Sequence, residues 1–266
     1  MAETGFVELL AGLEPGTQGR IETHIPKDWM QGRTTYGGLT AALSLEAALQ
    51  IVRDVPVRAV QVAFIGPVGG DLVISPSLLR HGKNSVFVNV DVVGEQGLSA
   101  RSLFTFGVNR DSALSYSDMP MPTGLPDPIK TGPLFPDTAR RPNFMQHFDM
   151  RLAEGARPVS GVDEPIAGMW LRHMDEGVHS SPTAVLALAD APPPAAMGMF
   201  KMPGPISSMT WMAEFLTDRF ETDEGWFYAR HAAQSISDGY SSQAMRLWAT
   251  DGTPVMVGRQ TVAVFV

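Results

Sequence analysis

The sequence predicts an α+β protein in which one structural plan occurs twice. Two segments of the 266-residue chain each place a helix-forming stretch before a series of strand-like runs. A proline-rich stretch separates these segments, and proline lacks the backbone N–H that a helix interior or a central strand requires. These observations divide the chain into an N-terminal half at 1–111, a linker at 112–143 and a C-terminal half at 144–266.

The first half is expected to contain one long buried helix. Gly37 and Gly38 stand at its start, and residues 39–52 are rich in alanine and leucine. Four runs of strand composition follow, with turn-forming residues between them. They are residues 57–64, 71–80, 85–93 and 99–108. This order predicts a helix packed against a four-stranded antiparallel meander.

The second half repeats the order with a shorter helix. Residues 183–190 have helical composition, and the prolines that begin at Pro192 end the helix. Four strand-like runs follow, at 209–216, 226–237, 240–249 and 253–266. In the third of these runs the alternation of polar and apolar residues is imperfect, which indicates a sheet that is covered on both faces.

The stretch between the halves is expected to be a linker that crosses the surface. Its prolines are Pro120, Pro122, Pro126, Pro128, Pro133, Pro136 and Pro142. So many prolines exclude a regular core element there.

Composition and charge exclude several classes of protein. The net charge of -8 and the pI near 5.2, without a dense run of Lys or Arg, argue against a nucleic-acid partner. The absence of cysteine excludes disulfides, thiolate metal sites and a cysteine nucleophile. Residues 1–16 lack the features of a signal peptide, and no apolar run approaches the roughly 20 residues of a membrane helix. We therefore expect a cytoplasmic protein without a membrane partner.

Histidine spacing and the familiar nucleotide and hydrolase motifs give no sign of a metal or cofactor. The histidines are His24, His81, His147, His173, His179 and His231. None has the spacing of a metal-binding pair, so no metal is expected. The chain also lacks the G-x-S-x-G, G-x-x-x-x-G-K-[ST] and G-x-G-x-x-G motifs, which argues against a serine-triad hydrolase, a nucleoside triphosphatase and a dinucleotide enzyme.

Short motifs occur in a characteristic order along most of the chain. The first half has RTTYGG at 33–38, FIGPV at 64–68 and RHGKNS at 80–85, and the second half has LADAPP at 188–193, ISSMT at 206–210 and VGRQT at 257–261. Together they resemble the type II, TesB-like acyl-CoA thioesterases. The resemblance implies a double hotdog, in which each half is an antiparallel sheet wrapped around a helix. It also implies hydrolysis of acyl-CoA to a free acid and CoA, with CoA as part of the substrate and no separate cofactor.

The resemblance implies three catalytic residues in the second half. They are Asp190 at the end of the helix, Ser208 before the next strand, and Gln260 on the last strand. Better-known members carry threonine where this chain has Ser208, and the neighbouring Ser207 is the alternative hydroxyl. Outside the family pattern, Asp190 could be a solvated helix stop, Ser208 a turn residue and Gln260 the polar side of a strand.

These residue types suit thioester hydrolysis by a bound water. The reaction needs a water aimed at the carbonyl carbon, a group that takes its proton, and donors for the oxyanion. Asp190 is the only carboxylate in the apolar run 184–200, and burial would raise its pKa above the ordinary value of about 3.9. The hydroxyl of Ser208 and the amide of Gln260 can hold the water without a covalent intermediate.

Two further features are candidates for binding the CoA part of the substrate. Gly37 and Gly38 could leave backbone N–H groups free at a helix start, and Lys83 and Asn84 offer a cation and donors in a turn. A tight turn explains the two glycines equally well, and an ordinary hairpin loop explains Lys83 and Asn84 slightly better than CoA binding does.

Two other functions remain open at this stage. The first is an acyl-CoA-binding protein that keeps the fold without catalysis. The second is an enoyl-thioester hydratase or dehydratase, which would use a histidine and an aspartate near the start of the helix, where this chain has Tyr36, Gly37 and Gly38. The resemblance also implies a homo-oligomer.

Overall fold

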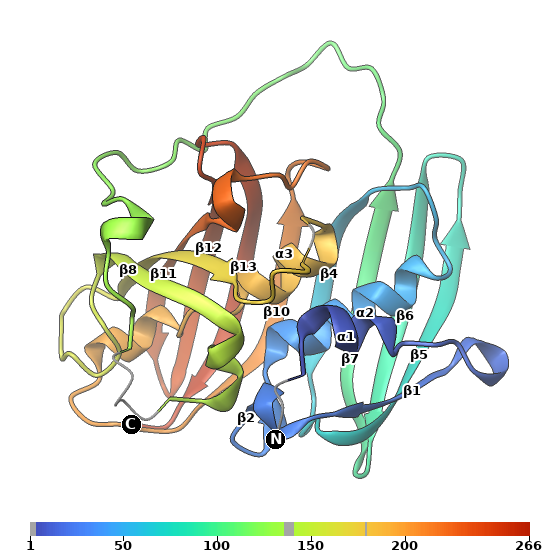
Figure 1. Ribbon diagram of the computed structural model, residues 1–266, viewed down its shortest axis with the longest axis horizontal. Helices are drawn as coiled ribbons and strands as arrows, with labels where there is room; N and C mark the ends of the chain where they lie inside the picture. The colour runs from blue at the N-terminus through green and yellow to red at the C-terminus, as the bar shows by residue number, and fades with distance from the viewer. Residues whose placement is uncertain (1–3, 136–140, 179) are drawn as a thin grey trace.

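A single curved sheet runs through both halves of the molecule. The computed structural model describes residues 4–135, 141–178 and 180–266. Its main sheet has 11 strands, all paired antiparallel, in the order β1-β5-β6-β7-β4-β10-β13-β12-β11-β9-β8. The strands β4 and β10 lie side by side at the centre and join the two halves (Figure 1).

The strands of this sheet are β1 (Ile21–Ile25), β4 (Val57–Phe64), β5 (Gly70–His81), β6 (Ser85–Gly94), β7 (Gly97–Gly107), β8 (Phe148–Gly155), β9 (Ile166–His173), β10 (Ile206–Phe215), β11 (Phe227–Ser237), β12 (Tyr240–Ala249) and β13 (Pro254–Val264). A separate two-stranded sheet pairs β2 (Met30–Gln31) with β3 (Thr34–Thr35). The α-helices are α1 (Phe6–Ala11), α2 (Gly37–Leu49) and α3 (Pro182–Ala189). The 3-10 helices are η1 (Thr17–Gly19), η2 (Lys27–Trp29), η3 (Pro128–Lys130), η4 (Asn143–His147), η5 (Ala195–Met199) and η6 (Asp223–Gly225).

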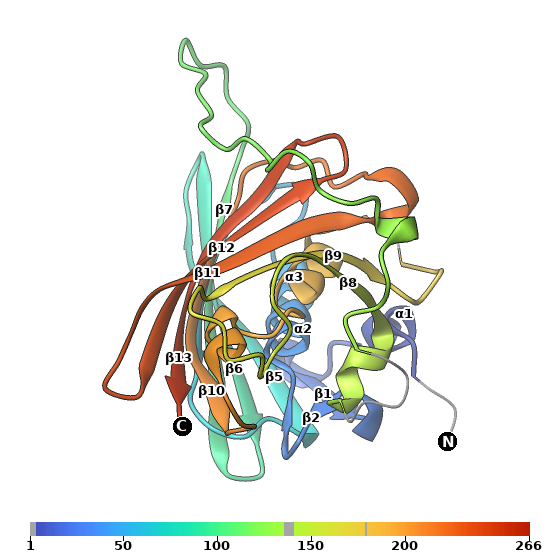
Figure 2. The same ribbon diagram turned by 90° about the vertical axis from the view of Figure 1, so that its left-hand side faces the viewer.

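The helices α2 and α3 pack against each other on the concave side of the sheet (Figure 2). Both are buried along most of their length, which their small and apolar side chains allow. The side chain of Ser181 accepts a hydrogen bond from the Ala184 N–H and so caps α3, and Pro182 occupies the first turn, where its missing N–H costs nothing. A hydrogen bond of 3.1 Å from Thr183 Oγ1 to Glu46 Oε2 joins the two helices.

The expected helices and strands are present, and the α+β double-hotdog fold class is confirmed. In the predicted four-stranded meander, β5, β6 and β7 pair in sequence order as expected, but the place of β4 is wrong, because β4 lies beside β7 and β10 and not beside β5. In the second half β10 likewise lies beside β13. Composition identifies a strand, but it carries no information about which other strand will pair with it.

The sequence reasoning also missed α1, β1, β8 and β9, which precede the main helix in each half. The strand β8 lies at the edge of the sheet, and its polar residues hid the strand pattern. Two of them form an ion pair within the strand, with Arg151 Nη2 2.9 Å from Asp149 Oδ2. Edge strands often carry charged side chains of this kind.

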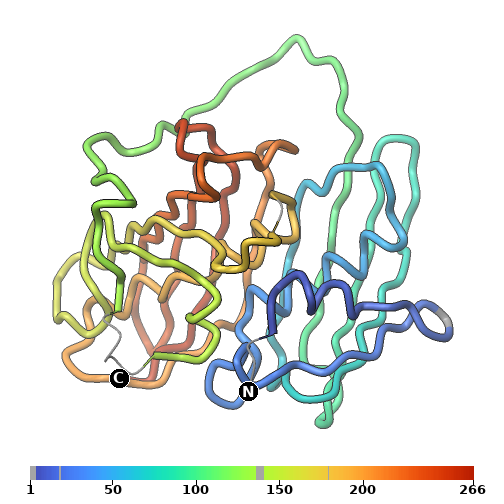
Figure 3. The backbone as a smooth tube through the Cα atoms, in the orientation of Figure 1, coloured from blue at the N-terminus to red at the C-terminus, as the bar shows by residue number. Residues whose placement is uncertain are grey.

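The proline-rich stretch begins as an exposed arch and then packs against the second half. Leu114 and Tyr116 are 87% and 89% exposed, and the chain after β7 arches between the halves (Figure 3). Farther on, Trp248 Nε1 donates to the Met119 carbonyl at 2.9 Å, and Trp170 Nε1 donates to the Pro126 carbonyl at 2.8 Å. This segment covers the outer face of β9, β11 and β12, as the pattern in residues 240–249 indicates.

Part of the predicted linker, including Pro136, lies outside the described residues, and its boundaries at 112 and 143 stay predictions. No helix in the described part of the chain is both long and apolar enough to cross a membrane.

Candidate active site

Asp190 lies at the C-terminal end of α3, where that helix meets the start of α2. The backbone N–H of Gly38 donates a hydrogen bond to its carboxylate. A Cβ atom on Gly37 would lie 2.7 Å from Asp190 Oδ2, and one on Gly38 would lie 2.2 Å from Tyr36 Oη and 2.6 Å from the Ala187 carbonyl oxygen. The two glycines are therefore required for the close approach of the helices.

Gln260 reaches Asp190 from the sheet below. It lies on β13, is 2% exposed, and donates a hydrogen bond of 2.8 Å from Nε2 to Asp190 Oδ1. Gln243 stands directly opposite on β12 and donates from its own Nε2 to Gln260 Oε1 at 2.8 Å. The backbone N–H of Ala195, at the start of η5, donates to Gln243 Oε1 at 3.0 Å.

The environment of Asp190 disfavours its charged form. Burial raises the pKa of Asp190 to about 7, although the hydrogen bonds from Gln260 and Gly38 act in the opposite direction. The residue still keeps some exposed surface. A carboxylate with a pKa near neutrality that can meet a water is well matched to general base catalysis.

Tyr36 adds a polar group next to Asp190. Its ring stacks on Phe144 with centroids 4.3 Å apart, and its buried hydroxyl has no hydrogen-bond partner in the described structure. Burial and then the nearby Asp190 charge raise the pKa of Tyr36 well above its usual value. Tyr36 therefore stays protonated and keeps a free donor.

Ser208 lies on the same inner face of the sheet as Gln260. Ser208 pairs with Val262, which is two residues beyond Gln260 on β13 and is fully buried. A bulge in β10 follows Ser208, and Ser207 is exposed. No hydrogen bond joins Ser208 to Asp190 or Gln260 in the described residues. The register thus turns Ser208 toward the site, but the described hydrogen bonds connect only Asp190 and Gln260 of the three predicted residues.

Lys83 and Asn84 lie far from Asp190. They are exposed in the turn between β5 and β6, and the Val108 N–H donates to the Asn84 carbonyl at 3.1 Å. This turn is at the end of the sheet where β4 begins, whereas Gly37 contacts Phe64 at the other end of β4. At about 3.3 Å per residue, the length of β4 separates the turn from the site by roughly 20 Å.

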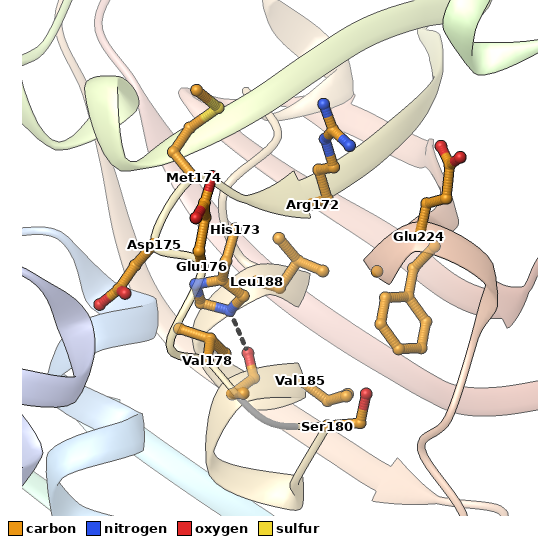
Figure 4. A pocket seen from close by; sticks show the side chains of 13 residues that line it. Arg172, His173, Met174, Asp175, Glu176, Val178, Ser180, Val185, Leu188 and Glu224 are labelled. Atoms are coloured by element: carbon orange, nitrogen blue, oxygen red, sulfur yellow. Dashed lines mark hydrogen bonds between the residues drawn. The ribbon is translucent and has the colours of Figure 1, made fainter.

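A cavity of about 410 Å³ lies along α3, apart from these residues (Figure 4). Its lining consists of Arg172, His173, Met174, Asp175, Glu176, Val178, Ser180, Ala184, Val185, Leu188, Glu224, Gly225 and Phe227. The floor from α3 is apolar and the rim carries charged side chains. His173 Nε2 lies 2.9 Å from the Ala184 carbonyl oxygen, and burial lowers the pKa of His173 to about 4. None of Asp190, Ser208 and Gln260 lines this cavity.

Sequence reasoning gave Tyr36 and Gln243 no catalytic role. Tyr36 belongs to the motif at 33–38, and Gln243 is a polar residue on a buried strand face, so both carried a local signal. The contacts that make them notable are nonlocal. In the part of the chain that the structure describes, no group of three or more His, Asp or Glu side chains is placed to hold a metal ion.

A sheet of this topology around two packed helices defines a double-hotdog protein, and family comparison identifies its class. The family model for the acyl-CoA thioesterase N-terminal domain matches residues 25–107, and the model for the C-terminal domain matches residues 117–264. The chain belongs to the acyl-CoA thioesterases and is a thioester hydrolase. Comparison with curated protein sequences gives no significant match.

Solved structures support the fold over nearly the whole chain. A conserved protein of unknown function with a hot dog fold from Alicyclobacillus acidocaldarius is 23% identical with a TM-score of 0.85, and the match covers 96% of this chain and 97% of that one. The tesB protein of Mycobacterium avium subsp. paratuberculosis is 18% identical, with a TM-score of 0.77 and coverage of 98% and 100%. The acyl-CoA thioesterase II TesB2 of Mycobacterium marinum is 16% identical, with a TM-score of 0.72 and coverage of 97% and 98%.

Proposed function

We propose that the protein hydrolyses acyl-CoA by direct attack of a water molecule that Asp190, Ser208 and Gln260 hold. The observation that carries this proposal is the hydrogen bond of 2.8 Å between Gln260 Nε2 and Asp190 Oδ1. It joins residues 70 positions apart, and it involves a largely buried carboxylate whose pKa is raised to about 7. Raised carboxylate pKa values of this size are common at catalytic sites.

Asp190 acts as the general base in this mechanism. The ionised carboxylate accepts a proton from the water as the water oxygen bonds to the thioester carbonyl carbon. The tetrahedral intermediate then collapses with cleavage of the C–S bond, and the acyl group leaves as the free acid. The CoA thiolate takes the proton that Asp190 holds, which restores the ionised carboxylate. Because a thiolate is a good leaving group, no strong general acid is needed.

Gln260 and Ser208 orient the water. Gln260 Oε1 already accepts a hydrogen bond from Gln243, and one Nε2 hydrogen is directed to Asp190. The second Nε2 hydrogen is therefore the group that Gln260 can offer to the water or to the developing oxyanion. Ser208, on the same inner face, supplies a hydroxyl that can either donate or accept.

The test is CoA release, measured with a thiol-reactive dye over acyl-CoAs from short to long. Asp190→Asn keeps the shape of the side chain but cannot take the proton, so kcat should fall by about 10² to 10⁴. Asp111→Asn, an exposed carboxylate outside the site, is the matched control and should keep wild-type rates.

Full activity in a folded Asp190→Asn protein would rule out Asp190 as the base. Tight binding of acyl-CoA by the wild type, with no CoA released from any substrate, would instead identify a non-catalytic acyl-CoA-binding protein.

A further inference from the structure

We infer that Gln243 is a positioning residue, which orients the amide of Gln260 so that its N–H group, and not its carbonyl oxygen, faces Asp190. This inference rests on the proposed function, because it assigns a role in the proposed site. It adds a residue from β12 and a backbone group from η5 to the three residues of the proposed mechanism.

The three hydrogen bonds that run from Ala195 through Gln243 and Gln260 to Asp190 all take their direction from the first donor, the Ala195 N–H. The backbone N–H of Ala195 can only donate, so Gln243 must turn its Oε1 toward it. Gln243 then donates from its Nε2 to Gln260, which must accept through its Oε1. Gln260 is left with Nε2 toward Asp190, where it donates at 2.8 Å.

Burial makes the alternative arrangement costly. Gln243, Gln260 and Ala195 are only 1%, 2% and 1% exposed, so water cannot replace a lost partner. If both amides were flipped, the Ala195 N–H would face a side-chain NH2 group, and the Asp190 carboxylate would face a carbonyl oxygen. Each mismatch leaves a buried polar group unsatisfied.

The backbone N–H at the start of η5 is the donor that sets the direction of these hydrogen bonds. The first N–H groups of a helix have no partner within the helix and require an acceptor from elsewhere. Ala195 directly follows Pro194, which is the N-cap of η5, and its N–H finds that acceptor in Gln243. The proline run after α3, which reads as a simple helix stop in the sequence, thus brings a backbone donor to the site.

The orientation of the Gln260 amide determines whether the site favours the ionised or the protonated form of Asp190. Donors at Gln260 and at the Gly38 N–H stabilise the ionised carboxylate, which is the form that acts as a base. A Gln260 carbonyl in the same place would favour the protonated acid, which cannot accept a proton from water.

Two titratable groups close to Asp190, Tyr36 and His231, stay uncharged near neutral pH. Burial raises the pKa of Tyr36, and burial lowers the pKa of His231, which bonds to the Ala189 carbonyl, to about 4. A change in the titration of Asp190 on altering Gln243 would therefore report on the amide orientation.

The experiment compares Gln243→Met with wild type and with Ser241→Ala. Methionine fills a similar volume without a donor or an acceptor, so Gln260 becomes free to turn its oxygen toward Asp190. Ser241 is the matched control, since it is fully buried on the same strand face and its hydroxyl has no partner in the described structure.

Two readouts are measured for each protein. In Gln243→Met, kcat/KM should fall about tenfold or more. The apparent pKa of the acid limb in its pH profile should rise by about 1 to 2 pH units, which is the size expected for loss of a hydrogen bond to a charged group. The second readout is the carboxyl ¹³C titration of Asp190 without substrate, assigned by the signal that Asp190→Asn lacks. The Asp190 pKa from this titration should rise by the same amount in Gln243→Met. Ser241→Ala should leave both readouts unchanged.

A second variant guards against misfolding of the first. Ala195→Pro removes the reference N–H at a helix position that accepts proline, and its ring Cδ takes the place of that hydrogen, so the Gln243 amide must turn or shift away. This variant should move the Asp190 titration in the same direction. An Asp190 titration identical to wild type in both folded variants would overturn the inference. If the wild type released no CoA, the proposed function would fail, while the ¹³C titration would still decide whether Gln243 orients Gln260.

Discussion

Asp190 combines two opposed influences at the level of a single residue. Burial at the junction of α2 and α3 disfavours its charge, whereas Gln260 and the Gly38 N–H favour it. Burial has the larger effect, and the pKa rises to about 7. The carboxylate is thus near half ionised at neutral pH, which suits the proposed role of accepting a proton from water and releasing it again.

This shift predicts a pH dependence of stability that belongs to Asp190. The pKa of Asp190 is about 7 in the folded protein and near 3.8 in the unfolded chain. Between these two pH values the folded state therefore holds a proton on Asp190 that the unfolded chain has lost. The stability contribution is fully present below about pH 4 and is lost as the pH rises through about 7, by at most about 4 kcal/mol. Urea unfolding at pH 5 and pH 8 should show the part of this loss that falls above pH 5, about 2 to 3 kcal/mol, in the wild type and a smaller loss in Asp190→Asn. Equal losses in both proteins would contradict the raised pKa.

At the level of elements, the site depends on how closely α2 and α3 approach. Gly37 and Gly38 have no side chain at the point of contact, and the hydrogen bond from Thr183 to Glu46 joins the helices at their other end. The helix α2 therefore presents its N-terminal end to Asp190. The partial positive charge at that end favours a nearby carboxylate.

Gly38→Ala should disrupt this junction. The new methyl group would lie 2.2 Å from Tyr36 Oη and 2.6 Å from the Ala187 carbonyl oxygen, so α2 must move away from α3. We expect a loss of about 1 to 3 kcal/mol in the free energy of unfolding, and a lower kcat as the Gly38 N–H leaves Asp190. Gly132→Ala is the control, because its Cβ would meet nothing within 4 Å. Comparable stability of the two variants in thermal and urea unfolding would show that the close approach is not required.

At the scale of the whole molecule, the two halves form one unit. The strands β4 and β10 pair from Thr210 opposite Ala63 to Glu214 opposite Ala59, and one hydrophobic core extends through both halves. The candidate site takes Gly38 from the first half and Asp190 and Gln260 from the second. Separate halves would each lack part of it.

A cut in the exposed arch should therefore leave the protein assembled. Chymotrypsin is expected to cleave first near Tyr116, which is 89% exposed and lies in a segment without regular structure. The two fragments should elute together on gel filtration under native conditions and keep their CoA-releasing activity. A protein with both Leu114 and Tyr116 replaced by serine should be cut more slowly. Separation of the fragments without denaturant would contradict a continuous sheet and core.

The sequence by itself determined the helices α2 and α3 and eight of the strands. These features depend on composition, periodicity and turn residues, all of which act over short stretches of chain. It also singled out Asp190 and Gln260, through the family motifs that contain them.

Only the tertiary structure decided which strands are neighbours and which side chains meet. The position of β4 between β7 and β10, the contact of Gly38 with Asp190, and the order from Ala195 through Gln243 to Gln260 all join distant parts of the chain. Such contacts form because burial leaves each polar group few possible partners, and the set of partners is defined only when the whole core has packed.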